Sequence, residues 1–175
     1  MNKKEIALVK PAKELEIQAL DYRQEHFSNG ETVINGSELL DKILSYDEWL
    51  DTVSKNSCSK TVHPDWVLTD TFFAVRKADH KIVGIIDLRY ELNDFLKDLG
   101  NCGYSVRPTE RKKGYATKML KELCMIAKAH GLKRIQLSVE KDNVASIRTI
   151  EKNGGIYERS FCIGNEEADV YLIDL

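Results

Sequence analysis

Apolar residues recur along this chain with two periods, and the changes between them mark the elements that we predict. Alternating or short apolar runs, which are typical of strands, occur at 6–10, 71–76, 82–90, 134–140, 156–163 and 169–174. Spacings of three and four residues, which are typical of helices, occur at 12–26, 46–54, 115–130 and 144–152. A further short strand ends at Pro108, because proline has no backbone N–H to donate.

The order of these elements indicates the fold class. Three strands in succession predict an antiparallel meander, and the helix at 115–130 predicts a crossover to a parallel strand. The strand at 82–90 is apolar on both faces at its start, so it should lie centrally with cover on both sides. The expected fold is α+β, with a mixed, mostly antiparallel sheet flanked by helices on both faces.

The stretch from Gly103 to Thr117 contains the clearest candidate for a binding loop. It reads Gly-Tyr-Ser-Val-Arg-Pro-Thr-Glu-Arg-Lys-Lys-Gly-Tyr-Ala-Thr, so a short strand, a basic loop and a glycine precede the predicted helix. The first amides of a helix lack partners within it and carry partial positive charge, so they favour a phosphate group. Gly114 has no Cβ and would let that group approach closely. The P-loop and G-x-G-x-x-G patterns are absent, and the alternative is a surface loop with solvated basic side chains.

A second informative stretch follows one helix and one strand later. Residues Arg134 to Glu140 alternate between polar and apolar side chains, as in a strand. Asn143 and Ser146 come next, and a helical run then ends at Gly154-Gly155. Asn143 is also a good N-cap residue, so its place at the start of this helix has a purely structural explanation too.

Together the two stretches resemble the GNAT superfamily of acyl-CoA-dependent N-acyltransferases. The segment Arg111-x-x-Gly114-x-Ala116 is similar to the [RQ]-x-x-G-x-[GA] loop of that family, and the strand, Asn143, helix and glycine follow in the family's order. The resemblance covers Phe72 to about Tyr157 firmly and the N-terminal third loosely. It implies the GNAT fold in a single domain over residues 1–175, with acetyl-CoA as the co-substrate.

The resemblance also implies which residues hold the cofactor. In the family, a splayed central strand lends backbone groups to the pantetheine arm, the loop amides hold the pyrophosphate, and the Asn contacts the cofactor. The matching residues in this sequence are Tyr104, Ser105, Val106, Arg111, Lys112, Lys113, Gly114, Tyr115, Ala116, Thr117, Asn143 and Ser146.

The implied reaction is direct transfer of an acetyl group from acetyl-CoA to a primary amine of a small molecule or peptide. The chain departs from the family at two positions, because Ile150 stands where many members have a Tyr acid and Ser138 where some have a Glu base. The acid and base therefore stay unassigned, and Asp87 and Glu91 are candidates near the expected cleft. Asp87 and Arg89 share a strand face, where they either form an ion pair or line the acceptor side. A catalytically weak, CoA-binding regulatory module is the alternative function.

Residues 31–70 form a long connection with a turn signal near its start and the predicted helix at 46–54. In the family this region supplies a wall of the acceptor pocket, so we expect the insert to shape the choice of substrate. The alternative is a surface excursion that does not contact the site.

Composition narrows the partners and the compartment. With 26 basic and 28 acidic residues the net charge is −2, which argues against nucleic acid as a partner. No apolar run is long enough to span a membrane and the N-terminus lacks the apolar core of a signal peptide, so we expect a cytoplasmic protein. The four cysteines and four histidines form no zinc-like cluster, so we expect no metal and buried or partly buried free thiols. A homodimer is left open.

Overall fold

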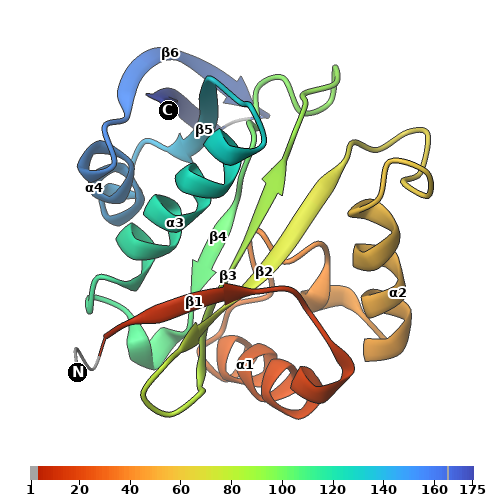
Figure 1. The fold of residues 1–175 in the computed structure, drawn as a ribbon. Helices are drawn as coiled ribbons and strands as arrows, with labels where there is room; N and C mark the ends of the chain where they lie inside the picture. Colours follow the sequence, from red (N-terminus) through yellow and green to blue (C-terminus); the bar gives the residue numbers. More distant parts are fainter. Residues whose placement is uncertain (1–3, 165) are drawn as a thin grey trace.

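A computed structural model describes residues 4–164 and 166–175 of the chain (Figure 1). The strands are β1 (Ile6–Val9), β2 (Thr69–Arg76), β3 (Ile82–Arg89), β4 (Tyr104–Val106), β5 (Arg134–Glu140), β6 (Ile156–Ile163) and β7 (Glu166–Asp174). The α-helices are α1 (Glu16–Ser28), α2 (Tyr46–Asn56), α3 (Tyr115–Ala129) and α4 (Val144–Lys152). Their order along the chain confirms the predicted one.

Most element boundaries lie within a few residues of the prediction. One difference is α1, which begins at Glu16 rather than at residue 12, because a 3₁₀ turn over Lys13–Leu15 precedes it. The other is β7, which begins at Glu166 rather than at Asp169. Its first residues are exposed glutamates that pair with the end of β6, so the apolar pattern does not reveal them. The predicted turn at Gly164-Asn165 includes Asn165, which lies outside the described residues.

The strands form two sheets, in the orders β1-β2-β3-β4 and β5-β7-β6. All ladders between the described strands are antiparallel. The predicted parallel pairing after the α3 crossover is wrong, because β4 and β5 lie in different sheets. Strand β4 is only three residues long, and the chain turns away at Pro108, so the two strands separate instead of forming a ladder.

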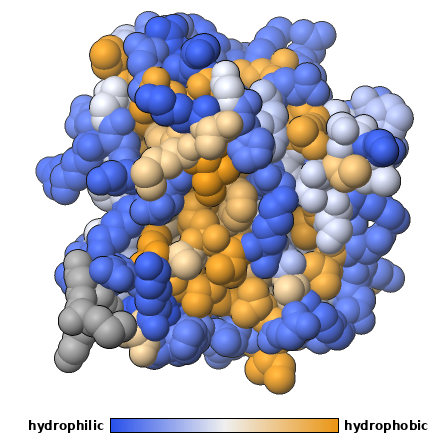
Figure 2. Space-filling view, in the orientation of Figure 1, coloured by the Kyte–Doolittle hydropathy of each residue, from blue (hydrophilic) through white to orange (hydrophobic). Residues whose placement is uncertain are grey.

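Both faces of the first sheet are covered, as predicted. Neighbouring residues of a strand point to opposite faces, so Phe72 and Ile86 pack on the α3 side while Phe73 and Ile85 pack on the side of α1 and α2. Figure 1 shows these two layers of helices. In the space-filling view, polar side chains cover most of the surface, and apolar side chains gather between α3 and α2 (Figure 2). No helix within residues 4–164 and 166–175 has the length and apolar character needed to cross a membrane.

The start of the 31–70 insert is docked directly on β4. The hydroxyl of Ser105 donates to the carbonyl oxygen of Asn35 over 2.9 Å. Gly36 adopts φ +73°, and a Cβ there would collide with the carbonyl of Gly103. The indole N–H of Trp49, on α2, donates to the Glu38 carbonyl oxygen over 3.0 Å and holds this turn from its other side. The insert therefore lies against the strand that begins at Tyr104.

We predict that Gly36→Ala destabilises the fold by about 2–4 kcal/mol, because the added methyl group strikes the Gly103 carbonyl in addition to straining the backbone. Gly30→Ala is the matched control, since Gly30 has φ +81° but open space around the added Cβ, and it should cost about 1 kcal/mol. Urea unfolding of both variants measures the two losses. Equal losses would mean that the insert does not rest on Gly103.

Candidate functional site

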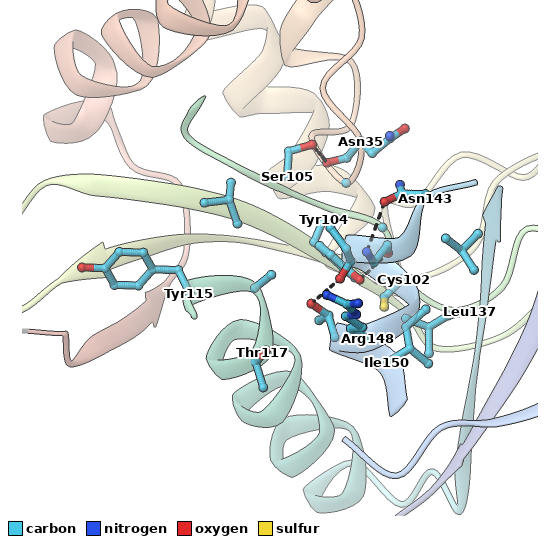
Figure 3. Close-up of a pocket in the computed structure, with 18 of the residues that line it drawn as sticks. Asn35, Cys102, Tyr104, Ser105, Tyr115, Thr117, Leu137, Asn143, Arg148 and Ile150 are labelled. Atoms are coloured by element: carbon cyan, nitrogen blue, oxygen red, sulfur yellow. Dashed lines mark hydrogen bonds between the residues drawn. The ribbon is translucent and has the colours of Figure 1, made fainter. Parts of the chain in front are cut away.

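A pocket of about 980 Å³ occupies the gap between β4 and β5 (Figure 3). One wall is β4, from Tyr104 to Val106, and the opposite wall is the end of β5, from Leu137 to Glu140. The start of α3 lines one part of the pocket and the first turns of α4 another. The site therefore lies where the two sheets fail to join.

The backbone of β4 has one edge bonded to β3 and the other directed into this gap. The N–H of Arg107 donates to the carbonyl of Val83, and the carbonyl of Gly103 accepts the N–H of Asp87. The backbone groups of residues 103, 105 and 107 therefore face β3. In an antiparallel pair this pattern alternates, so the N–H and C=O groups of Tyr104 and Val106 point away from β3. The Val106 carbonyl already accepts from Nε of Arg111 at 3.1 Å, and the other three groups can pair with an extended ligand in the pocket.

The start of α3 is a helix N-terminus without a side-chain cap. Gly114 occupies the N-cap position with φ +88°, and no side chain bonds the helix amides there. By contrast, Ser45 caps α2 and Asn143 caps α4 through side-chain oxygens. The first amides of α3, from Tyr115 to Thr117, therefore carry partial positive charge toward the pocket and can bind an anion.

The basic side chains of the loop have different partners. Arg111 lines the pocket, but its guanidinium forms a two-bond pair with Glu31 at 2.6 and 2.7 Å. These bonds lower the pKa of Glu31 to about 2. Lys112 lines the pocket with φ +61°, whereas Lys113 is not among the lining residues and pairs with Glu110 at 3.0 Å. Lys112 is therefore the loop lysine placed to face a bound anion.

The first turn of α4 is tied to β4 across the pocket. The side-chain oxygen of Asn143 accepts the Ser146 N–H at 3.1 Å, which is the N-cap geometry. The Ser146 hydroxyl in turn bonds the Tyr104 hydroxyl at 2.6 Å (Figure 3). Burial raises the pKa of Tyr104, so this phenol stays neutral at physiological pH. The sequence predicted a role for the backbone of Tyr104. The contact of its side chain with Ser146 could not be predicted from a single sequence, because the two residues are far apart in the chain.

Both positions that depart from the family pattern lie in the pocket wall. Ile150 is buried and lines the pocket, so position 150 itself offers no hydroxyl where the family pattern has a tyrosine. Ser138 also lines it, but its hydroxyl donates to the carbonyl of Leu99 at 3.0 Å. Neither side chain can act as a strong acid or base.

The candidate carboxylates lie behind the pocket or away from it. Asp87 is fully buried and forms an ion pair with Arg89, whose Nη2 lies 2.7 Å from Oδ2, which is one of the two alternatives left open by the sequence. Arg89 itself lines the pocket, beside Gly103 and Cys102. Glu91 lines a separate hollow formed by 64–67 and 91–95. The expectation that Glu91 belongs to the cleft is therefore not supported by its position.

The insert contributes part of the pocket wall through Glu31, Val33, Asn35 and Gly36. Within the described part of the chain, no group of three His, Cys, Asp or Glu side chains could hold a metal ion. The four cysteines are free thiols, but Cys58 and Cys162 are exposed, so the expectation that all would be buried or partly buried is wrong for these two. Cys58 follows the end of α2 and Cys162 lies in β6, and most residues near each are exposed. The overall composition of the chain does not predict the burial of single cysteines.

Solved structures with the same fold include several acetyltransferases. Ribosomal-protein-S5-alanine acetyltransferase from Vibrio fischeri is 17% identical, with a TM-score of 0.73 over 99% of this chain and 94% of that one. The structure of yncA from Salmonella typhimurium, which holds acetyl-CoA, is 15% identical, with a TM-score of 0.67 over 99% and 94%. Microcin C7 self immunity acetyltransferase MccE, in complex with acetyl-CoA and AMP, is 16% identical, with a TM-score of 0.70 over 100% and 98%.

A search of curated proteins finds no match to the sequence. The sequence model of the Acetyltransferase (GNAT) family, however, matches residues 37–155, which include the pocket-lining parts of β4, α3, β5 and α4. The chain belongs to the GNAT family of acetyltransferases.

Proposed function

We propose that this protein transfers an acetyl group from acetyl-CoA directly to a primary amine of a small molecule or peptide. The observation that carries the proposal is the uncapped N-terminus of α3, which opens into the pocket between β4 and β5. An anion-binding helix end and an outward-facing strand edge in one cavity suit a ligand that joins a pyrophosphate to an extended amide arm.

The residues present fit coenzyme A along the length of the pocket. The amides from Lys112 to Thr117 would hold the pyrophosphate, with Lys112 as the nearby cation. The outward backbone groups of Tyr104 and the N–H of Val106 would pair with the amide groups of the pantetheine arm, while the Val106 carbonyl accepts from Arg111. Asn143 and Ser146 border the same cavity, so the capping role of Asn143 is compatible with a contact to the cofactor.

The pocket also supports the chemistry of direct transfer. The amine nitrogen forms a C–N bond with the thioester carbon, the C–S bond breaks, and the sulfur takes a proton. Much of the rate comes from holding the two reactants in line, which two opposed walls can do. An outward N–H of β4 would stabilise the developing oxyanion. A thiol with a pKa of about 8.5 can leave as its thiolate without a dedicated acid.

The amine would enter beside the 31–70 insert. Four residues of the insert line the pocket, at 31, 33, 35 and 36. We infer that this segment shapes the acceptor side and so the choice of substrate. Because the V. fischeri neighbour is an alanine acetyltransferase of a ribosomal protein, the amines to be tested include peptide N-termini.

A CoA-binding regulatory module is the second candidate, and the nonpolar side chain of Ile150 in the pocket wall favours it. We predict instead that the protein releases CoA thiol from acetyl-CoA when mixed with a panel of peptide N-termini, lysine peptides, amino acids and small aliphatic amines. Release is measured with a thiol reagent after subtraction of protein alone, because Cys58 and Cys162 are exposed and react themselves. Binding of CoA without release for any amine would favour the regulatory module.

For the cofactor loop we predict that Gly114→Val lowers CoA affinity by about 10- to 100-fold, as expected for the loss of one charge-assisted bond to phosphate. The matched control is Gly131→Val at the other end of α3, because both glycines have nearly the same φ, +88° and +89°, and open space around an added Cβ. Titration calorimetry measures both affinities. Equal affinities in two folded variants would contradict the loop assignment. The CoA affinity of the wild type should also fall as the salt concentration rises, because salt screens the attraction between the loop and the phosphates.

A further inference from the structure

Two basic side chains of α4 line the pocket without a partner. They are Arg148 and Lys152, which lie about one helical turn apart on the same face. Both residues are exposed, and neither makes a hydrogen bond or an ion pair with another residue that the structure describes. Figure 3 shows Arg148 among the residues around the pocket. The helix therefore presents two unpaired positive charges to the cavity.

The helix itself does not account for both charges. Like charges four residues apart on a helix repel each other, at a cost of about 0.2–0.5 kcal/mol. Lys152 has a structural role, because a cation in the last turn interacts favourably with the helix dipole. Arg148 lies in the middle of α4, where that interaction is weak, and no ion pair joins it to Glu151, three residues on. A negatively charged ligand in the pocket would offset the repulsion.

The last turn of α4 lies beside the first turn of α3. The side-chain amide of Asn153 donates to the carbonyl of Thr117 at 3.2 Å and to that of Thr149 at 2.9 Å. Thr117 belongs to the first turn of α3, where we propose that the pyrophosphate binds. Lys152 directly precedes Asn153, so its charge lies at this end of the pocket. Arg148 lies one turn back along α4.

Acidic side chains do not neutralise this end of the pocket. The pocket-lining carboxylates of Glu31 and Glu110 each pair with basic residues outside α4. Glu140 ends β5, before the start of α4, so the length of that helix, roughly 13 Å, separates it from Lys152. Lys112, from the loop, adds a third positive charge without an acidic partner among the described residues. The cavity is therefore more positive beside α3 than the helix amides alone would make it.

The proposed cofactor has a second phosphate that matches this surplus charge. CoA carries a phosphate monoester on its ribose, and only that ribose separates the monoester from the pyrophosphate. A phosphate monoester has about −1.5 to −2 charges at pH 7 and three acceptor oxygens. An Arg guanidinium can donate two parallel bonds to such a group, and a Lys ammonium adds a point charge. An Arg and a Lys one turn apart can therefore bind it together.

We propose that Arg148 and Lys152 form a second phosphate site, which binds the ribose phosphate of CoA beside the pyrophosphate at the start of α3. The inference rests on the proposed function, because it concerns the cofactor of the same reaction. The site makes the protein selective for CoA over dephospho-CoA, which lacks only that phosphate. No bond forms or breaks at this site, so binding alone measures its effect.

The test compares the affinities of CoA and dephospho-CoA by titration calorimetry. The wild type should bind CoA about 10- to 100-fold more tightly, as expected for one charge-assisted contact with a phosphate. In the double variant Arg148→Gln/Lys152→Gln, the affinity for CoA should fall by about the same factor, while that for dephospho-CoA stays nearly unchanged. Both positions are exposed and Gln is a good helix former, so the variant should fold.

The matched control is Lys121→Gln/Lys128→Gln, which removes two positive charges from exposed positions on α3 outside the pocket. It changes the net charge of the protein by the same amount, but salt screens these distant charges from the ligand. The control should therefore keep the wild-type preference for CoA. An equal loss of preference in the two double variants would overturn the inference, because net charge rather than position would then decide the selectivity.

The other outcomes separate this inference from the proposed function. Equal affinities of the wild type for CoA and dephospho-CoA overturn the inference and leave the proposed acetyl transfer intact. A preference that survives in a folded Arg148→Gln/Lys152→Gln variant also overturns it. An equal loss of both affinities in that variant overturns it as well, because the two side chains would then act on the pyrophosphate. Failure of the wild type to bind either ligand overturns the proposed function, and the inference with it.

Discussion

The separation of β4 from β5 is the constraint on which the rest of the structure depends. A strand edge that is neither paired nor exposed must be satisfied by something else, because unpaired backbone groups are costly to bury. Here the Val106 carbonyl accepts from Arg111, and the outward groups of Tyr104 and the N–H of Val106 face a pocket instead of a neighbouring strand. The same separation lets the uncapped end of α3 and the capped end of α4 open into one cavity. We therefore propose the gap between the sheets as the ligand site.

The polar contacts around the gap keep its two sides in place. Tyr104 and Ser146 connect β4 to α4, while Arg111 and Glu31 connect the loop to the segment after α1. Ion pairs of this kind contribute little to stability when they are exposed. Here these contacts position the two walls of the pocket, because no backbone ladder joins β4 to β5. At the end of β3, Asp87 pairs with Arg89 and accepts the N–H of Gly103, which fixes the residue before β4.

Local patterns in the sequence predicted what is local in the structure. Apolar alternation identified β5 to the residue, and the glycine at 114 marked the start of α3, because both depend on neighbours within a few positions. The relation between β4 and β5 was predicted wrongly, since pairing depends on groups far apart in the chain. The contacts of Glu31 with Arg111 and of Asn35 with Ser105 join segments that share no pattern in a single sequence. The departures at Ser138 and Ile150 were visible in the sequence, because the family pattern says which residue to expect at each position.

Amide hydrogen exchange with and without CoA tests most directly whether the gap holds the cofactor. On addition of CoA, exchange should slow at the amides of Tyr104 and Val106, which face the pocket, and at those of Ala116 and Thr117 at the start of α3. The amide of Ser105 is the internal control, because it already faces β3 and should change less. Slowed exchange at these positions would support the account, whereas protection confined to other parts of the chain would contradict it.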